Sequence, residues 1–385
     1  MKIGSFQFNL RELAGSMGDF GTLLPLVIGY ITVCKLEPAG LLVMLGVVNI
    51  VTGLVYRLPM PVEPMKVLAV VAIAQAWTPV EVYTSGLAMG LVWLGVGATG
   101  AMDVIARWTP RSVIRGIQLS LGALLAVEGV KLVGTWWLLG LAAIALVLVL
   151  RANPYAPASI VLVIGGIAIM AARGQLAGVG ELSFSLPALT WPDPRQLWPV
   201  LRDGGLAQIP LTATNAVIAT SALISEYWPQ RRVTHRQLSV NMGVMNVVLP
   251  FFGGMPLCHG AGGLAGQYYF GARTGGTNLI EGAIEIALGL LFAGSIAALF
   301  AAFPLAIVGA MMLLVGFEVL KHARDLRLDR QLIPVAATVA GSLLVNMAAG
   351  FALGLAVHHL FTGRARPRGD DRAEAEAEER RRRPG

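Results

Sequence analysis

Long stretches without charge are the feature that most constrains how this chain can fold. Residues 132–150, 237–272 and 286–317 contain no Asp, Glu, Lys or Arg. A helix needs about 20 apolar residues to cross the hydrocarbon of a bilayer. Only 13% of the residues are charged, whereas a soluble domain carries roughly 25%. The sequence therefore predicts an all-α polytopic membrane protein.

The remaining composition excludes several classes of protein. Two cysteines cannot form a disulfide framework or a four-ligand zinc site. The sequence has no Walker A motif and no Ser-His-Asp, Cys-His or paired-carboxylate arrangement, so we expect no enzyme activity, no metal and no cofactor. The formal net charge of +7 comes from basic residues in short connectors and one tail, where they set membrane orientation. We therefore expect no nucleic-acid partner.

Apolar runs between polar connectors define the membrane spans. The region after Gln331 is too short for two full spans, so the chain has 13 spans, or 14 if the last two helices are short. With 14 spans, most of the 29 Lys and Arg residues lie on the N-terminal side, which the positive-inside rule makes cytoplasmic. The prediction is a multi-pass protein of the cell membrane, plasma or inner, with both termini in the cytoplasm. The other spans are expected at 19–34, 39–56, 61–77, 82–105, 111–131, 133–150, 157–172, 205–224, 237–252, 256–272, 279–302 and 304–320.

The two halves of the chain share a weak repeat. Residues 24–26 (Leu-Pro-Leu) match residues 209–211 (Ile-Pro-Leu), and residues 60–64 (Met-Pro-Val-Glu-Pro) match residues 255–259 (Met-Pro-Leu-Cys-His). The matches lie in the first and third spans of each half. Because each half has an odd number of spans, seven, the second copy crosses the membrane in the opposite direction, which makes the repeats inverted.

The third span of each half, span 3 or span 10 of the chain, is predicted to be a broken helix. Three prolines between residues 59 and 64 favour extended backbone followed by a helix that starts at Pro64. The glycine-rich residues 253–263 indicate the same pattern. Both half-helices then begin at mid-membrane. A helix N-terminus carries unpaired N–H groups and about half a positive charge, so two of them facing each other form an anion site.

Five motifs stand out in the membrane region: residues 12–25, 60–66, 208–212 with Asn215, 255–267 and 271–275. They cover nearly the whole membrane region, and together they resemble one known family, the molybdate transporters related to sulfate permeases. Sulfate permeases normally add a cytoplasmic regulatory domain after the membrane part, whereas only a short charged tail follows Thr362 here.

The resemblance implies a fold of about 14 transmembrane segments in two inverted seven-span repeats, shared with nucleobase transporters. It also implies a substrate held between the third and tenth spans and lined by the first and eighth. A core domain would comprise residues 1–106 and 205–303, and a gate domain residues 107–172 and 304–362. The remaining parts are an external connector, 173–204, and a disordered charged cytoplasmic tail, 363–385.

Glu63 departs from the pattern of the family, which commonly has Gln at this position. An acid beside an oxyanion site opposes anion binding. Glu63 is therefore protonated, or it pairs with Lys66, which lies three residues on, or the substrate or the coupling differs.

The candidate site residues come from these spans, and each also has a structural interpretation. Polar side chains in apolar spans commonly bond to a neighbouring helix, and Asp19 or His259 can cap its own helix. Charge within a membrane favours function, which makes Glu63 and Asp19 candidates for coupling. The predicted substrate-binding residues are Thr22, Pro64, Met65, Lys66, Gln208, Thr212, Asn215, His259, Gly260, Ala261 and Gly262.

These observations favour a secondary active transporter that imports a tetrahedral oxyanion, molybdate first and sulfate second, coupled to a cation such as the proton. An alternative keeps the fold but transports a nucleobase or another small solute with protons. A membrane receptor or scaffold without transport is the third hypothesis. The expected partners are the oxyanion and the lipid bilayer, with a homodimer left open.

Overall fold

The computed structural model describes residues 2–18, 20–150, 158–176, 180–321 and 330–362. The protein is mostly helical, with a few strands of two residues each. The elements of its first half are β1 (Lys2–Ile3), β2 (Phe6–Gln7), α1 (Leu10–Ser16), α2 (Phe20–Thr32), α3 (Pro38–Tyr56), β3 (Glu63–Pro64), α4 (Lys66–Ala74), α5 (Pro79–Thr99), α6 (Met102–Trp108), α7 (Arg111–Val133), the 3-10 turn η1 (Gly134–Trp136), α8 (Trp137–Leu150) and α9 (Ala158–Ala172).

The second half contains two π-helical segments, which are wider turns than those of an α-helix. They interrupt a continuous helical stretch from Pro194 to Tyr227. Its elements are η2 (Pro194–Gln196), α10 (Leu197–Val200), η3 (Leu201–Gly205), α11 (Leu206–Leu211), η4 (Thr212–Ala219), α12 (Thr220–Tyr227), α13 (His235–Val248), η5 (Leu249–Phe252), β4 (Leu257–Cys258), α14 (Ala261–Phe270), α15 (Gly276–Ala302), α16 (Leu305–Lys321), α17 (Leu332–Leu344) and α18 (Met347–Thr362).

Each predicted span has a helix in the described residues, and the region after Gln331 forms two short helices, α17 and α18. Two boundaries differ from the prediction. The eighth span begins before residue 205, because helix already forms at Pro194 inside the predicted connector. The fourth span is interrupted at Gly100, whose φ of +71° ends α5 before α6 begins. The predicted tail, 363–385, lies outside the described residues.

Helices begin where the sequence supplies caps. Thr78 and Glu81 form a capping box at the start of α5, and Pro79 occupies its first position. Thr234 and Gln237 form the same box at the start of α13. These side chains satisfy N–H groups that a helix leaves free at its start.

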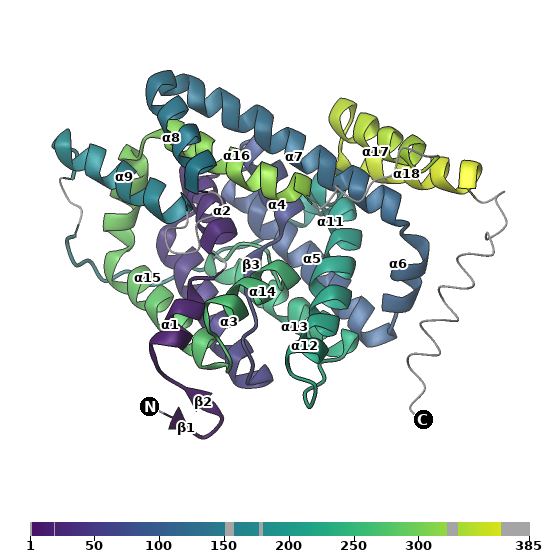
Figure 1. Ribbon diagram of the computed structural model, residues 1–385, viewed down its shortest axis with the longest axis horizontal. Helices are drawn as coiled ribbons and strands as arrows, with labels where there is room; N and C mark the ends of the chain where they lie inside the picture. The colour runs from purple at the N-terminus through teal and green to yellow at the C-terminus, as the bar shows by residue number, and fades with distance from the viewer. Residues whose placement is uncertain (1, 19, 151–157, 177–179, 322–329, 363–385) are drawn as a thin grey trace.

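Pairs of glycines bring the main helix pairs into close contact. Gly46 of α3 faces Gly282 of α15, and Gly129 of α7 faces Gly309 of α16. In each pair, the first glycine lies against the backbone carbonyl of the second. Small residues at such interfaces are typical of helix packing in membranes. Figure 1 shows α7, α8, α16, α17 and α18 along one side of the molecule and α3, α12, α13, α14 and α15 along the other.

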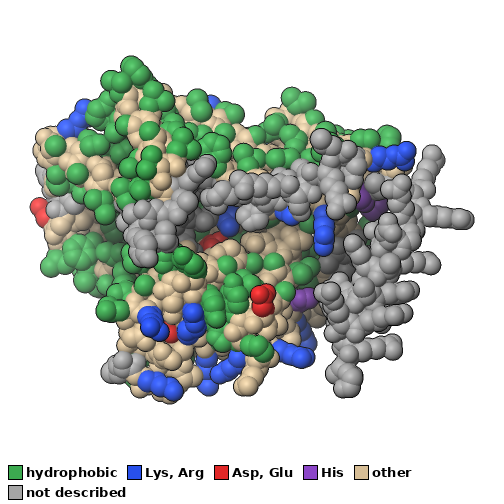
Figure 2. Space-filling view, viewed as in Figure 1, with side chains coloured by type: hydrophobic (Ala, Val, Ile, Leu, Met, Phe, Trp, Pro, Cys, Tyr) green, Lys and Arg blue, Asp and Glu red, His purple; other side chains and the backbone are tan. Residues whose placement is uncertain are grey.

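The outer surface is strongly apolar, and the centre holds a short buried helix. Among the described residues, five helical stretches are long and apolar enough to cross a membrane, and Figure 2 shows hydrophobic side chains over much of one face. On α7 and α8, Val130 is 62% exposed and Val149 78% exposed. Residues 67–73 of α4, by contrast, are all buried. Since a helix that is apolar all round lies inside a protein or a membrane, α4 is the central element that positions the candidate site.

Candidate binding site where two extended segments meet

Two extended segments from opposite halves of the chain pair at the centre of the molecule. β3 and β4 are antiparallel, with Glu63 opposite Cys258 and Pro64 opposite Leu257. The Met65 N–H extends this pairing by donating to the Pro256 carbonyl at 3.0 Å. Each strand leads within three residues into a helix, α4 or α14, and Figure 1 shows β3 next to α14. The two helix starts are therefore adjacent, as the proline and glycine pattern predicted. The predicted start of the first helix at Pro64 is wrong, because Pro64 pairs within β3 and α4 begins at Lys66.

Two asparagines satisfy the backbone of these extended segments, which lack the internal hydrogen bonds of a helix. The side chain of Asn278 accepts from the Met60 N–H at 3.0 Å and donates to the Met60 carbonyl at 2.6 Å. Asn246 does the same for Leu257, at 2.8 Å and 2.6 Å. Unpaired backbone groups cost several kcal/mol in a membrane interior, so these asparagines permit the break in each span. Sequence reasoning missed this role. Asn246 lies within the predicted span 237–252, whereas Asn278 lies just before the predicted span 279–302.

The first turn of α4 is capped from another helix. The Gln208 side-chain oxygen accepts from the Val67 N–H at 2.7 Å, and its amide nitrogen donates to the Thr212 hydroxyl at 2.7 Å. The structure thus brings the predicted residues Gln208 and Thr212 to the helix start. It also differs from the expectation that the start of this half-helix forms part of an anion site, because the N–H groups of Met65 and Val67 donate to protein acceptors.

The first turn of α14 has no such cap among the described residues. Its N-cap residue, Gly260, has no side chain, and no described side chain accepts a hydrogen bond from the N–H groups of this turn. Gly262 is exposed, and a Cβ atom placed on it would meet no atom within 4 Å. Ala261 beside it is half-buried. The first turn of α14 therefore presents its backbone to open space, which suits an anion.

The Glu63 carboxylate lies against this same turn. A Cβ on Gly260 would come within 2.9 Å of Glu63 Oε2, and a Cβ on Gly263 would collide with Glu63 Oε1. Glu63 is 1% exposed and forms an ion pair with Lys66, whose Nζ lies 3.2 Å from Oε2. Lys66 is the more accessible partner, with 22% of its side chain exposed. The start of α14 thus has one negative group of the protein beside it and one cation within reach.

His259 holds the two segments together. Its Nδ1 lies 3.0 Å from the Pro61 carbonyl oxygen, and its Nε2 lies 2.9 Å from Asn241 Oδ1. The ring is fully buried and contacts Tyr56 edge-on, with ring centroids 5.9 Å apart. Both ring nitrogens are therefore engaged within the protein.

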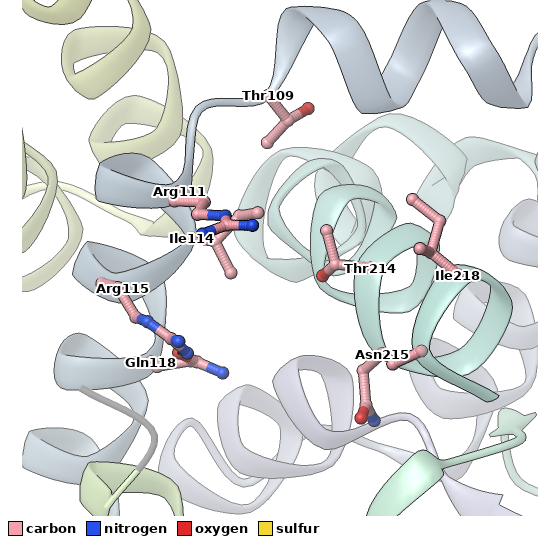
Figure 3. A pocket seen from close by; sticks show the side chains of 9 residues that line it. Thr109, Arg111, Ile114, Arg115, Gln118, Thr214, Asn215 and Ile218 are labelled. Carbon is pink, nitrogen blue, oxygen red and sulfur yellow. The ribbon is translucent and has the colours of Figure 1, made fainter. Parts of the chain in front are cut away.

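The other predicted residues are distributed as follows. Asn215 lines a separate cavity together with Arg111 and Arg115 (Figure 3). Thr22 belongs to α2, but its side chain lies outside the described part of the chain, as does the whole of Asp19. The structure therefore assembles Pro64, Met65, Lys66, Gln208, Thr212, His259, Gly260, Ala261, Gly262 and Glu63 around the two helix starts.

Comparison with known proteins gives one consistent family. The model of a family described as "Molybdate transporter of MFS superfamily" matches residues 11–125 and 201–319. Molybdate transporter 1 of Arabidopsis thaliana is 30% identical over 419 residues, which cover 94% of this chain and 91% of that protein. Molybdate transporter 1 of Chlamydomonas reinhardtii is 30% identical over 471 residues, covering 91% of each.

Solved structures share the fold at lower identity. The transmembrane domain of a cyanobacterial bicarbonate transporter, BicA, has a TM-score of 0.63 and 20% identity, covering 90% of this chain and 95% of that chain. The murine anion transporter Slc26a9, in its inward-facing state, has a TM-score of 0.72 and 14% identity, covering 94% of this chain and 69% of that chain. At these identities the likeness shows the fold of their transmembrane domains.

Proposed function

Because this chain belongs to the molybdate transporter family, which consists of multi-pass membrane transporters and not enzymes, we propose that it imports molybdate by secondary active transport. Molybdate is a tetrahedral dianion that offers four oxygen acceptors. The observation that carries the proposal is the first turn of α14, which no described side chain caps and whose backbone is exposed at Gly262. Lys66 supplies the positive charge, since its ammonium lies beside the same turn as the Glu63 carboxylate.

Proton coupling through Glu63 is the second part of the proposal. The buried Glu63 carboxylate lies where an oxyanion would bind at α14, so the two negative groups repel each other. A proton on Glu63 removes this repulsion. Coupling is needed because each uncompensated charge that moves inward against a negative interior costs about 2.3 kcal/mol per 100 mV.

The topology that accompanies this function has 14 crossings in two inverted repeats, with both termini in the cytoplasm. Residues 1–106 and 205–303 would form the moving core, and 107–172 and 304–362 the gate. The packing supports this division, because α3 packs on α15 and α5 on α13, whereas α7 packs on α16 and α17. The part of the predicted connector that precedes the helix at Pro194, residues 173–193, would lie outside, where the N–H groups of Ser183 and Ser185 donate to backbone carbonyls of α15.

Uptake of radiolabelled molybdate into proteoliposomes tests the function and the coupling together. We expect wild-type uptake to rise with an inward proton gradient and to fall as the pH outside rises, because fewer protons are then available to enter with the substrate. Glu63→Gln cannot carry a proton, so its uptake should not depend on the proton gradient or on pH. An unchanged pH profile in Glu63→Gln rules out coupling through this residue.

Competition in the same assay separates the substrates. Tungstate and sulfate in excess should compete with molybdate, because they share its tetrahedral shape and charge. Stronger inhibition by sulfate than by unlabelled molybdate would assign the chain to sulfate transport. Inhibition by uracil and not by these oxyanions would assign it to nucleobase transport.

A further inference from the structure

An uncharged, apolar stretch lies in the connector between α9 and η2. Residues 182–192 contain no Asp, Glu, Lys or Arg, although the proposed topology places them outside. Protein surfaces that face water rarely expose large apolar side chains in such number. We call these side chains the apolar row; they are Leu182 (73% exposed), Phe184 (69%), Leu186 (67%), Leu189 (67%) and Trp191 (73%).

The serines of this stretch attach it to α15. The Ser183 N–H donates to the Leu291 carbonyl at 3.0 Å, and the Ser185 N–H donates to the Leu290 carbonyl at 2.8 Å. A Cβ atom placed on Gly294 would lie 2.9 Å from Ser183 Oγ, so this side chain also faces α15. Figure 1 shows the connector leaving α9 and passing α15. The stretch therefore contacts α15 through its serines and leaves the apolar row uncovered.

These hydrogen bonds reach a part of α15 that lies inside the membrane. At 1.5 Å per residue, α15 is about 40 Å long, whereas the hydrocarbon core of a bilayer is about 30 Å thick. The distance along α15 from Leu290 to its outer end at Ala302 is about 18 Å. Even with the whole excess of about 10 Å on the outer side, Leu290 lies about 8 Å below the hydrocarbon boundary. The connector therefore reaches into the outer leaflet of the proposed topology.

Backbone groups of the connector are satisfied as the membrane interior requires. Irregular backbone at this depth is tolerated only where protein or water provides its hydrogen bonds. Besides the two serine N–H groups, the Gly180 N–H donates to Ser295 Oγ at 3.1 Å, and that hydroxyl donates to the Glu181 carbonyl at 2.8 Å. Pro187 has no N–H to satisfy. These features lower the cost of placing the connector in lipid.

The apolar surface of α15 continues up to the connector. Ile284 (45% exposed), Leu288 (40%) and Leu291 (40%) recur at intervals of three or four residues and therefore share one face of the helix. The carbonyl of Leu291 is the one that accepts from Ser183. Uncovered apolar side chains on a membrane span face lipid, so the apolar row extends a lipid-facing surface. Trp191 suits this position as well, because Trp is enriched where a membrane meets water.

We propose that residues 182–192 form a re-entrant anchor in the outer leaflet, with the apolar row in contact with the acyl chains of the lipid bilayer. The choice of leaflet rests on the topology given with the proposed function, whereas the contact with lipid rests on the hydrogen bonds to α15.

Further hydrogen bonds join the anchor to two other elements. The Thr190 N–H donates to the Phe251 carbonyl of η5 at 3.0 Å, and the Asp193 N–H donates to the Thr84 hydroxyl of α5 at 2.9 Å. Since α5, η5 and α15 all belong to the proposed core, the anchor moves through the lipid together with the core.

Spin labels in the full-length protein, reconstituted in phosphatidylcholine liposomes, test the anchor. Single cysteines are introduced after the two native cysteines, both buried, have been replaced by Ala. The test positions are Phe184→Cys and Leu186→Cys. Leu288→Cys on α15 is the lipid-facing reference, and Gln230→Cys, exposed in the connector after α12, is the water-facing reference. The measurement compares the accessibility of each nitroxide to oxygen, which concentrates in lipid, and to a nickel chelate, which stays in water.

We expect accessibility to oxygen to exceed that to the nickel chelate at both test positions and at Leu288→Cys, with the reverse at Gln230→Cys. Greater access for the nickel chelate at both test positions would mean that the stretch lies in water, and would overturn the anchor. Low access for both reagents would mean that protein, such as a second copy of this chain, covers the apolar row, and would also overturn it.

The fluorescence of Trp191 provides a second measurement that keeps the native cysteines. Bromine atoms on the acyl chains of phosphatidylcholine quench tryptophans that lie close to them. We expect Trp191→Phe to lose part of the wild-type emission that brominated lipid quenches. Equal quenched emission in wild type and Trp191→Phe would contradict the anchor. Neither measurement uses molybdate, so a failure here is distinct from a failure of the proposed function, which absence of molybdate uptake by the wild type would show.

Discussion

The starts of α4 and α14 follow similar backbone arrangements but differ in their side-chain caps. Each follows an extended segment, and each has one asparagine that satisfies that segment's backbone, Asn278 or Asn246. The first turn of α4 is then capped by Gln208, whereas no described side chain caps the first turn of α14, which is exposed at Gly262. The start of α4 is therefore bonded within the protein, whereas the start of α14 has exposed backbone that a ligand can reach.

The difference assigns separate roles to two helix termini that carry similar partial charges. The macrodipole of α4 acts on Gln208, a neutral amide of the protein, while that of α14 acts on the Glu63 carboxylate beside it. A mobile anion can compete with a carboxylate that gains a proton, but it cannot displace a buried amide without leaving its partners unpaired. Two helix starts at one place thus do not make two equal binding sites.

Removal of Asn246 or Asn278 should have the largest effect on stability. Each of these side chains satisfies the backbone of the extended segment before a helix, which is the feature that the two helix starts share. Asn246→Leu leaves the Leu257 N–H and carbonyl unpaired, and Asn278→Leu does the same at Met60. Each orphaned buried group costs about 1–3 kcal/mol, so each variant should lose roughly twice that. Thermal unfolding in detergent measures the loss. A stability within 1 kcal/mol of wild type for either variant, about the net worth of one hydrogen bond, would contradict the role of these side chains.

Two adjacent glycines, Gly262 and Gly263, test whether the difference between α4 and α14 lies in the first turn of α14. Gly263→Ala places a Cβ against Glu63 Oε1 and within 2.8 Å of Pro61 Cβ, so it should cost up to about 3 kcal/mol and abolish molybdate uptake. Gly262→Ala, the matched control, meets no atom within 4 Å. It should keep wild-type stability and change only the apparent affinity for molybdate. Equal thermal stability of the two variants would mean that Glu63 does not lie against this turn.

The cap of α4 should show the smallest effect on transport. Gln208→Met leaves the buried Val67 N–H without its acceptor and should cost about 2 kcal/mol. Thr212→Val removes only the acceptor of the Gln208 amide and should cost less, about 1 kcal/mol. Both should retain the affinity for molybdate, measured by titration. A selective loss of affinity in Gln208→Met with normal stability would mean that Gln208 binds the substrate and is not only a cap of α4.

The sequence predicts the helical membrane fold and the position of the two breaks. Uncharged apolar runs indicate the spans, and the prolines at 59, 61 and 64 with the glycines of 253–263 indicate the extended segments. The resemblance to the molybdate transporters then identifies the family, which the comparisons confirm. These features could be predicted because hydropathy and backbone chemistry are local properties of the chain.

The inequality of the two helix starts could not be predicted in the same way. The contact between Gln208 and Val67 spans 141 residues, and that between Asn278 and Met60 spans 218. No local pattern states which polar side chain of one span reaches which backbone group of another. The arginines of α7 illustrate the same limit, since the sequence assigned Arg111 and Arg115 to membrane orientation, while the structure places them around a cavity.

The pairing of β3 with β4 also sets an order of events during synthesis. When β3 leaves the ribosome, its partner is still untranslated, and the Met65 N–H has no Pro256 carbonyl to meet. At roughly 5–20 residues per second, nearly two hundred residues take on the order of 10–40 s to make. For that time the prolines of the first half lie in or near the bilayer with unmet backbone groups. During that interval the unpaired backbone groups of the β3 segment need hydrogen-bond partners from the insertion machinery or from water, until β4 is made and pairs with β3.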